Sequence, residues 1–227
     1  MIVRAGDLVA APNFAQLLER LGDVDPSRVR LIPQPGMATD EDCAESKDRY
    51  GRLCEMVDGT LVEKIIGWAE ARLAATLARL IENYLQSHPL GIVLGPDGPV
   101  RIASRVIRMP DVSFIPWSRV PPEFDSMPAG PIMEIVPDLA IEVISPSNRP
   151  GEMNVKLHEY FKRGVRLVWY LYHEQRLARA FTSPKRGTDV GLDDCLDGRD
   201  VLPGFRIKLQ DVYDEAFPKR PKKKRGK

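Results

Sequence analysis

The chain has 227 residues, of which 43% are hydrophobic and 29% charged, and its formal net charge is +1. This composition is typical of one soluble globular domain with a sizeable core plus an appendage. The sequence has no apolar run of about 18 residues, no signal peptide and no CxxC pair among its three cysteines, which argues against a membrane span, secretion, a disulfide framework or a zinc knuckle. We therefore expect a cytoplasmic protein.

The first half of the chain predicts two short helices, a hairpin and a long helix. Residues 14–21 are typical of a helix, and Thr39 is a suitable N-cap for a second helix that begins with three acids. In "RLCEMVDGTLVEK" the Asp58-Gly59 pair lies between two strand-like runs, a strong hairpin signal. Apolar residues then recur at three-to-four spacing from Ile66 to Tyr84, which predicts a helix that stops at His88-Pro89.

Short strands dominate the second half. "GIVLG", "PVRI" and "RVIRMPDVSFIP" are bounded by Gly and Pro, and a proline-rich loop leads to "DLAIEVIS", which we interpret as the central strand. Residues 150–163 predict a helix ended by Gly164, followed by the strands "VRLVWYLY" and "LARAFT". This order predicts an α/β fold with a mixed β-sheet flanked by helices, preceded by an N-terminal hairpin and a helical appendage over residues 1–48.

Charge is distributed unevenly along the chain. The last nine residues, KRPKKKRGK, contribute +7 to a total of +1, so the preceding residues carry −6. We expect residues 218–227 to form a basic disordered tail, with sequence-independent contact to phosphates as the functional alternative. The acidic body argues against a strong nucleic-acid footprint elsewhere.

Two carboxylates occupy unusual positions. Glu142 lies inside the apolar run "AIEVI", where a carboxylate is costly to bury without a partner, and Asp111 follows Pro110 at the start of "DVSFI". If the two strands are neighbours, both acids point into one cleft and can bind a hard divalent cation such as Mg²⁺. Lys156, on the following helix, can reach the same site. A metal together with a lysine is what phosphodiester cleavage requires.

Five separated blocks carry a family resemblance: "LCEMVDGTLVEK", "RMPDVSFIPW", "PDLAIEVISPSN", "EMNVKLHEYFKRGVRLVWYL" and "VLPGF". They resemble the Uma-type putative restriction endonuclease family of bacteria, a branch of the PD-(D/E)XK nuclease fold. The resemblance implies a nuclease-like domain over residues 49–217, with Asp111 and Glu142 as the two acids. The superfamily's lysine two residues after the second acid is replaced by Ile144, and the resemblance assigns its role to Lys156. It also implies a further acid, for which Glu70 is our candidate and Glu55 and Glu63 are alternatives.

The resemblance implies a Mg²⁺-dependent endonuclease, with Mn²⁺ as a possible substitute, that acts on DNA as a homodimer. The alternative of another class is a DNA-binding or mobile-element-associated protein with the same fold and reduced catalysis, and a third is a purely structural domain. For single residues the simpler readings are an Asx turn at Asp111, a salt bridge from Glu142 to Arg166 and a solvated Lys156. Ser145 has no histidine placed to activate it.

Overall fold

The structure is a computed structural model, which describes residues 13–122 and 130–219. Its helices are α1 (Phe14–Arg20), α2 (Asp40–Ala44), α3 (Ser46–Tyr50), α4 (Trp68–Leu85), α5 (Pro150–Lys162) and α6 (Leu209–Ala216), with 3-10 turns η1 (Pro26–Arg28) and η2 (Trp117–Arg119). Most of the predicted proline-rich loop and nearly all of the basic tail lie outside the described residues. In the part of the chain that is described, no helix has the length and apolarity needed to cross a bilayer.

Two larger sheets and one small ribbon make up the β-structure. The six-stranded sheet has the order β10-β9-β8-β7-β6-β3 and the four-stranded sheet the order β2-β1-β5-β4, while β11 pairs with β12. The six-stranded sheet contains β3 (Gly91–Leu94), β6 (Val112–Pro116), β7 (Leu139–Ile144), β8 (Leu167–Tyr172), β9 (Leu177–Ser183) and β10 (Arg186–Val190). The others are β1 (Cys54–Val57), β2 (Thr60–Glu63), β4 (Val100–Ala103), β5 (Val106–Arg108), β11 (Cys195–Asp197) and β12 (Arg206–Lys208).

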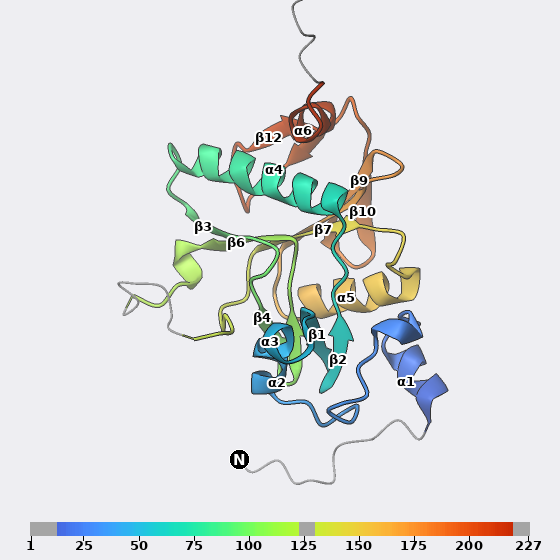
Figure 1. Ribbon diagram of the computed structural model, residues 1–227. Helices are drawn as coiled ribbons and strands as arrows, with labels where there is room; N and C mark the ends of the chain where they lie inside the picture. The colour runs from blue at the N-terminus through green and yellow to red at the C-terminus, as the bar shows by residue number, and fades with distance from the viewer. Residues whose placement is uncertain (1–12, 123–129, 220–227) are drawn as a thin grey trace, which may run out of the picture.

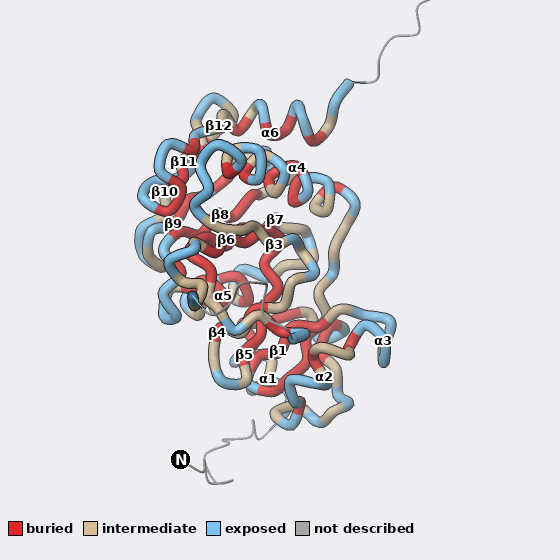
Figure 2. Tube along the Cα trace, turned by 90° about the vertical axis from the view of Figure 1, so that its left-hand side faces the viewer, coloured by how far each residue is buried: buried red, intermediate tan, exposed pale blue. Residues whose placement is uncertain are grey.

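The six-stranded sheet is mixed, as the sequence predicts. Strands β7 and β8 pair in parallel, joined through α5, and the other neighbours in this sheet are antiparallel. Helices α4 and α6 cover one face and α5 covers the other (Figure 1). Figure 2 shows the buried residues concentrated along the central strands between these helices. The predicted strand "DLAIEVIS" is therefore β7, in the interior of the sheet.

Side chains of β7 alternate between two cores. Leu139, Ile141 and Val143 pack with α4, whereas Ala140 packs with Met153 of α5. Because successive side chains of a strand point to opposite faces, Glu142 lies on the α5 face together with Ala140. A carboxylate is thereby placed in the layer between the sheet and α5.

The predicted hairpin forms around the Asp58-Gly59 turn. Both turn residues have positive φ, 49° and 72°, which is the backbone conformation that an Asp-Gly pair favours in a two-residue hairpin loop. Strand β1 of this hairpin also pairs with β5 rather than with the mixed sheet. Helix α1 packs its apolar side on the same hairpin, and Val29 bridges to Val62.

The segment "RVIRMPDVSFIP" is not one strand. Its first part is β5 of the four-stranded sheet and its second part is β6 of the six-stranded sheet. The chain crosses between the sheets at Met109-Pro110, since proline cannot donate to a ladder and interrupts pairing there. Asp111, the next residue, therefore lies where the two sheets meet.

Candidate active site

The two predicted acids face each other across neighbouring strands. Strands β6 and β7 pair antiparallel with Val112 opposite Ile141, so one further step in the same register places Asp111 opposite Glu142. The amide of Val143 donates a 2.7 Å hydrogen bond to Asp111 Oδ2. Asp111 is 6% exposed and Glu142 5% exposed. The expectation that the two strands are neighbours is confirmed.

Lys156 reaches this pair from α5. Its Nζ lies 3.2 Å from Glu142 Oε1 and 3.0 Å from Oε1 of Glu55 on β1. The side chain is buried, so the reading of Lys156 as a solvated residue is wrong. Tyr160, one helical turn further along α5, donates its hydroxyl to the same Glu142 oxygen. Glu142 thus has a cation and a neutral donor on one oxygen, and no hydrogen bond to its Oε2 is found among the described residues.

Glu55 is the acid that joins the two sheets. Its Oε1 accepts a hydrogen bond from the Met109 amide at 2.9 Å, and its Oε2 lies 2.9 Å from Arg108 Nη1. Arg108 also pairs with Glu159 of α5 at 2.6 Å. Because Glu55 is 2% exposed and shares Lys156 with Glu142, it belongs to the same cluster of charges.

The other candidate acids lie elsewhere. Glu70 is in the first turn of α4, where its Oε2 approaches Gly67 so closely that a Cβ there would lie 2.2 Å from it. Glu63 pairs with Arg30 at 3.0 Å. Within the described ranges, neither makes an ion pair with Lys156. Of the three acids considered for the additional position, the structure brings only Glu55 to the pair.

Lys64 is a site residue that the sequence analysis missed. Its Nζ lies 2.9 Å from Asp111 Oδ1 and donates to the backbone carbonyls of Pro96 and Met109. It directly follows β2, and its side chain is 8% exposed. The only sequence signal is its position at the end of the "LVEK" block, because local patterns do not show that β2 ends beside Asp111.

The remaining alternatives can also be placed. Arg166 pairs with Asp138 at 2.9 Å, so the cation that faces Glu142 is Lys156 instead. The Ser145 hydroxyl hydrogen-bonds to Ser147 and Asn148 of its own turn, with no histidine among its partners in the described chain. These contacts leave the acids and lysines as the candidate active groups of the site.

Burial and mutual charge set the acidities of the cluster. Burial raises the pKa of Glu142 to about 7, and the neighbouring charges of Asp111 and Glu55 add to the rise, while Lys156 opposes it. Burial would also raise the pKa of Glu55, but Lys156, Arg108 and Lys64 outweigh it and hold that pKa far below its usual range. Burial disfavours the ammonium of Lys156, yet Glu142 and Glu55 together raise its pKa. Lys156 therefore stays charged at neutral pH.

A divalent cation fits the donor set of this site. Mg²⁺ binds through one or two carboxylates and takes its other ligands from water and substrate phosphates. Asp111 and Glu142 supply two such groups, and Glu142 has an oxygen without a hydrogen bond. In the described residues there is no group of three or more His, Cys, Asp or Glu side chains that could hold a metal. The two carboxylates are thus suited to bind a divalent ion together with water and phosphate ligands. In this structure their charge is offset by Lys64 and Lys156.

A mixed sheet with helices on both faces, and two opposed acids and a lysine between the sheet and one helix, defines a fold of the restriction-endonuclease-like class. The chain belongs to the Uma2 family, described as "putative restriction endonuclease", which it matches over residues 42–210. This membership supports a nuclease role.

Among solved structures, the chain is similar to the crystal structure of a "putative nuclease belonging to DUF820" from Anabaena variabilis. The TM-score is 0.65 at 15% sequence identity, over 74% of this chain and 93% of that chain. At this identity the likeness shows the shared fold. No curated protein matches the sequence.

Proposed function

We propose that the protein is a Mg²⁺- or Mn²⁺-dependent endonuclease that hydrolyses phosphodiester bonds of DNA. The observation that carries the proposal is the placement of Asp111 and Glu142 opposite each other, with the Lys156 ammonium 3.2 Å from Glu142. The proposed metal ligands are Asp111 and Glu142. When bound, the ion supplies Lewis acidity, which lowers the pKa of a water molecule and offsets the charge of a phosphate.

The chain's own residues then bind, orient and stabilise charge. The Val143 amide fixes the Asp111 carboxylate, and Tyr160 fixes Glu142, so both acids are held in place before a substrate arrives. Lys156 stays protonated because Glu55 and Glu142 both favour its charged form. A charged ammonium beside the reacting phosphate stabilises the negative charge that develops during hydrolysis. Glu55 acts as a positioning residue, since it holds Lys156 and is itself held by Arg108.

One observation favours the second candidate, a DNA-binding protein with reduced catalysis. Lys64 pairs with Asp111, and Lys156 pairs with Glu142, so each proposed metal ligand already has a cation. A divalent ion must bind beside these ammonium groups or displace one of them. Metal affinity therefore distinguishes the two candidates, and we propose in both cases that the chain works as a homodimer on DNA.

Cleavage of supercoiled plasmid, single-stranded DNA and RNA in Mg²⁺, Mn²⁺ or EDTA tests the proposal. We expect nicking of DNA with either metal, none in EDTA, and a loss of at least about 100-fold for Glu142→Gln. Glu82→Gln, which neutralises an exposed acid of α4, is the matched control and should cleave like the unmodified chain. Size-exclusion chromatography with and without duplex DNA reports the assembly state.

The absence of both cleavage and metal binding would overturn the proposal. If no metal supports cleavage and calorimetry detects no heat of Mg²⁺ or Mn²⁺ binding, the acids serve as ion-pair partners and the nuclease proposal is abandoned. DNA affinity measured in EDTA and in Mg²⁺ then decides for the DNA-binding candidate. Because the residues before the basic tail carry −6, we expect metal to strengthen DNA binding if the ion sits between Asp111 and Glu142.

A further inference from the structure

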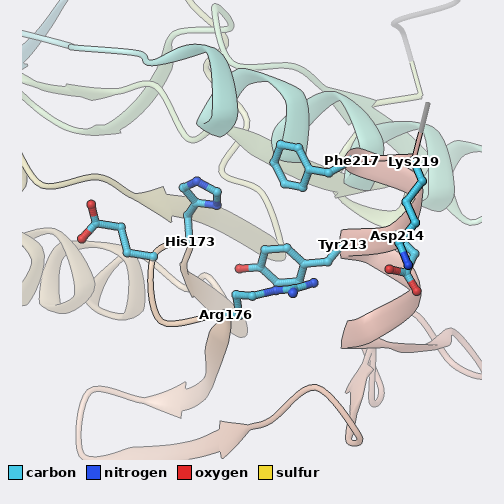
Figure 3. A pocket seen from close by; sticks show the side chains of 7 residues that line it. His173, Arg176, Tyr213, Asp214, Phe217 and Lys219 are labelled. Carbon is cyan, nitrogen blue, oxygen red and sulfur yellow. The ribbon is translucent and has the colours of Figure 1, made fainter.

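A pocket lies away from the acid–lysine cluster, which consists of Asp111, Glu142, Glu55, Lys156 and Lys64. It has a volume of about 440 Å³, within the range of small-ligand sites. The turn between β8 and β9 forms one side and α6 with the residues after it forms the other (Figure 3). Its lining residues are His173, Glu174, Arg176, Tyr213, Asp214, Phe217 and Lys219. Four of these follow residue 210, where the match to the family ends.

The rings of His173, Tyr213 and Phe217 line part of this pocket. The Tyr213 ring stacks with His173 at a centroid distance of 6.4 Å and with Phe217 at 6.3 Å. The Arg176 guanidinium lies over Tyr213, 4.9 Å from the ring centroid. Trp68, at the start of α4, meets Phe217 edge-on and is 77% exposed. Such a group of flat π-faces is suited to a planar ligand.

Two buried polar atoms of the pocket have no partner. Tyr213 Oη and His173 Nδ1 are both inaccessible to solvent and make no hydrogen bond within the described parts of the chain. Tyr213 is 2% exposed, and burial raises its pKa to about 12, so the hydroxyl remains a donor at neutral pH. Figure 3 shows this hydroxyl on the side of the ring that faces His173. An unsatisfied buried hydroxyl costs about 1 to 3 kcal/mol, which a ligand with polar edges would recover.

The charges around the pocket favour a neutral ligand over an anion. Arg176 and Lys219 are offset by Glu174 and Asp214, so the lining carries no net charge. Lys219 is also the first residue of the basic stretch KRPKKKRGK. A neutral ring that is attached to phosphates fits this lining, because the ring meets the aromatic side chains and Lys219 offers a cation for a phosphate.

A short stretch of chain links the pocket to the proposed active site. Lys64 contacts Asp111, and Trp68, whose ring meets Phe217 of the pocket, lies four positions further along the chain. Four residues span at most about 14 Å. A substrate strand that reaches both sites must pass around the end of the sheet, because Glu142 lies on its α5 face and α6 covers the opposite face.

We propose that this pocket binds an unpaired nucleobase of the nucleic-acid substrate. The base stacks on the half-buried ring of Phe217, and its polar edge bonds to Tyr213 Oη and His173 Nδ1. The choice of ligand class rests on the proposed nuclease function, but the pocket itself is independent of the acids. It would give the protein a preference for DNA with single-stranded or unpaired segments over continuous duplex.

The test compares two strands that differ only in their bases. Fluorescently labelled single-stranded DNA of about ten nucleotides and an abasic strand of the same length are titrated into the full chain in EDTA, where no cleavage occurs. Both strands carry the same phosphates, so contact with the basic stretch is equal. Stacking of one base is worth about 1 to 3 kcal/mol, so we expect the abasic strand to bind about 5- to 100-fold more weakly.

Two variants assign that difference to the pocket. Tyr213→Phe keeps the ring and removes the unpaired hydroxyl, and Arg176→Gln removes the stacked cation. Each should weaken binding of the normal strand about 2- to 10-fold and leave the abasic strand unchanged. Arg186→Gln removes the same charge from an exposed position at the other end of the β9–β10 hairpin and should behave like the unmodified chain.

Equal affinity for the two strands would overturn the proposal, and so would variants that bind both strands like the unmodified chain. Plasmid cleavage in Mn²⁺, measured separately, keeps this outcome distinct from failure of the nuclease proposal. Cleavage without base-dependent binding removes the pocket from the substrate site. Base-dependent binding without cleavage retains the pocket and removes the catalytic role of the acids.

Discussion

The acid–lysine cluster and the aromatic pocket differ in whether their buried polar groups have partners. In the cluster, Asp111, Glu55 and Glu142 each have a charged partner within 3.2 Å. In the pocket, Tyr213 and His173 keep polar atoms that no described residue satisfies. Buried charges must be compensated for the chain to fold at all, whereas a single neutral hydroxyl can be left unpaired at modest cost. The comparison indicates that the cluster is fixed before any ligand arrives, and we propose that the pocket is completed by one.

The largest expected effect is the removal of the cation that the cluster shares. Lys156→Met leaves Glu142 without an ion-pair partner and Glu55 with Arg108 alone, which should lower the free energy of unfolding by about 3 to 5 kcal/mol. Urea denaturation measures this change. Lys162→Met, on the exposed side of the same helix, is the control and should change stability by less than about 0.5 kcal/mol. Similar values for the two variants would mean that the cluster does not need Lys156.

The second prediction uses the opposite pKa shifts of two acids in the cluster. The pKa of Glu55 is lowered in the folded state. Its charged form therefore stabilises the fold at pH values above its unfolded pKa of about 4.3, and this stabilisation is lost as the pH falls. The pKa of Glu142 is raised to about 7, so between about 4.3 and 7 the folded chain binds the extra proton. Stability should therefore decrease as the pH rises through that window.

Glu142→Gln should remove this decrease. The shift corresponds to a difference on the order of 3 kcal/mol between about pH 5 and pH 8, measured by urea denaturation in EDTA. Glu82→Gln, at an exposed position, should retain the pH dependence of the unmodified chain. A Glu142→Gln variant that loses stability with rising pH as steeply as the unmodified chain would contradict the assignment to Glu142.

The third prediction separates phosphate contact from base contact. Residues 220–227 contain six of the seven basic residues of the C-terminal stretch. Their deletion should weaken binding of normal and abasic single strands alike, by about tenfold at low salt. The slope of log K against log salt should also become shallower, by about 0.7 for each phosphate that the deleted residues neutralise. An unchanged slope would show that these residues do not bind the phosphates.

The smallest expected effect lies in the pocket. Tyr213→Phe removes a buried hydroxyl that has no partner, so we expect the free protein to become more stable by about 1 kcal/mol. Thermal unfolding detects this as a rise in Tm of a few degrees. A lower Tm would mean that the hydroxyl already contributes to the folded state, for example through a bound water, and would weaken the contrast with the cluster.

The sequence by itself determined the local elements and part of the site. The Asp58-Gly59 turn, the Thr39 cap and the helix that begins at Pro150 form where residue preferences place them. The apolar run around Glu142 predicted a buried central strand. The family blocks placed Asp111, Glu142 and Lys156 in one site, and the structure brings them together.

Only the tertiary structure decided which other groups complete the two sites. Lys156 meets Glu55 across 101 residues of sequence because α5 packs against the four-stranded sheet. Lys64 reaches Asp111 because the chain crosses from one sheet to the other at Met109-Pro110. The pocket forms where α6 packs beside the β8–β9 turn, which brings Tyr213 to His173. Local preference follows from each residue's own backbone and neighbours, whereas these contacts depend on how separate elements pack, which no short stretch of sequence encodes.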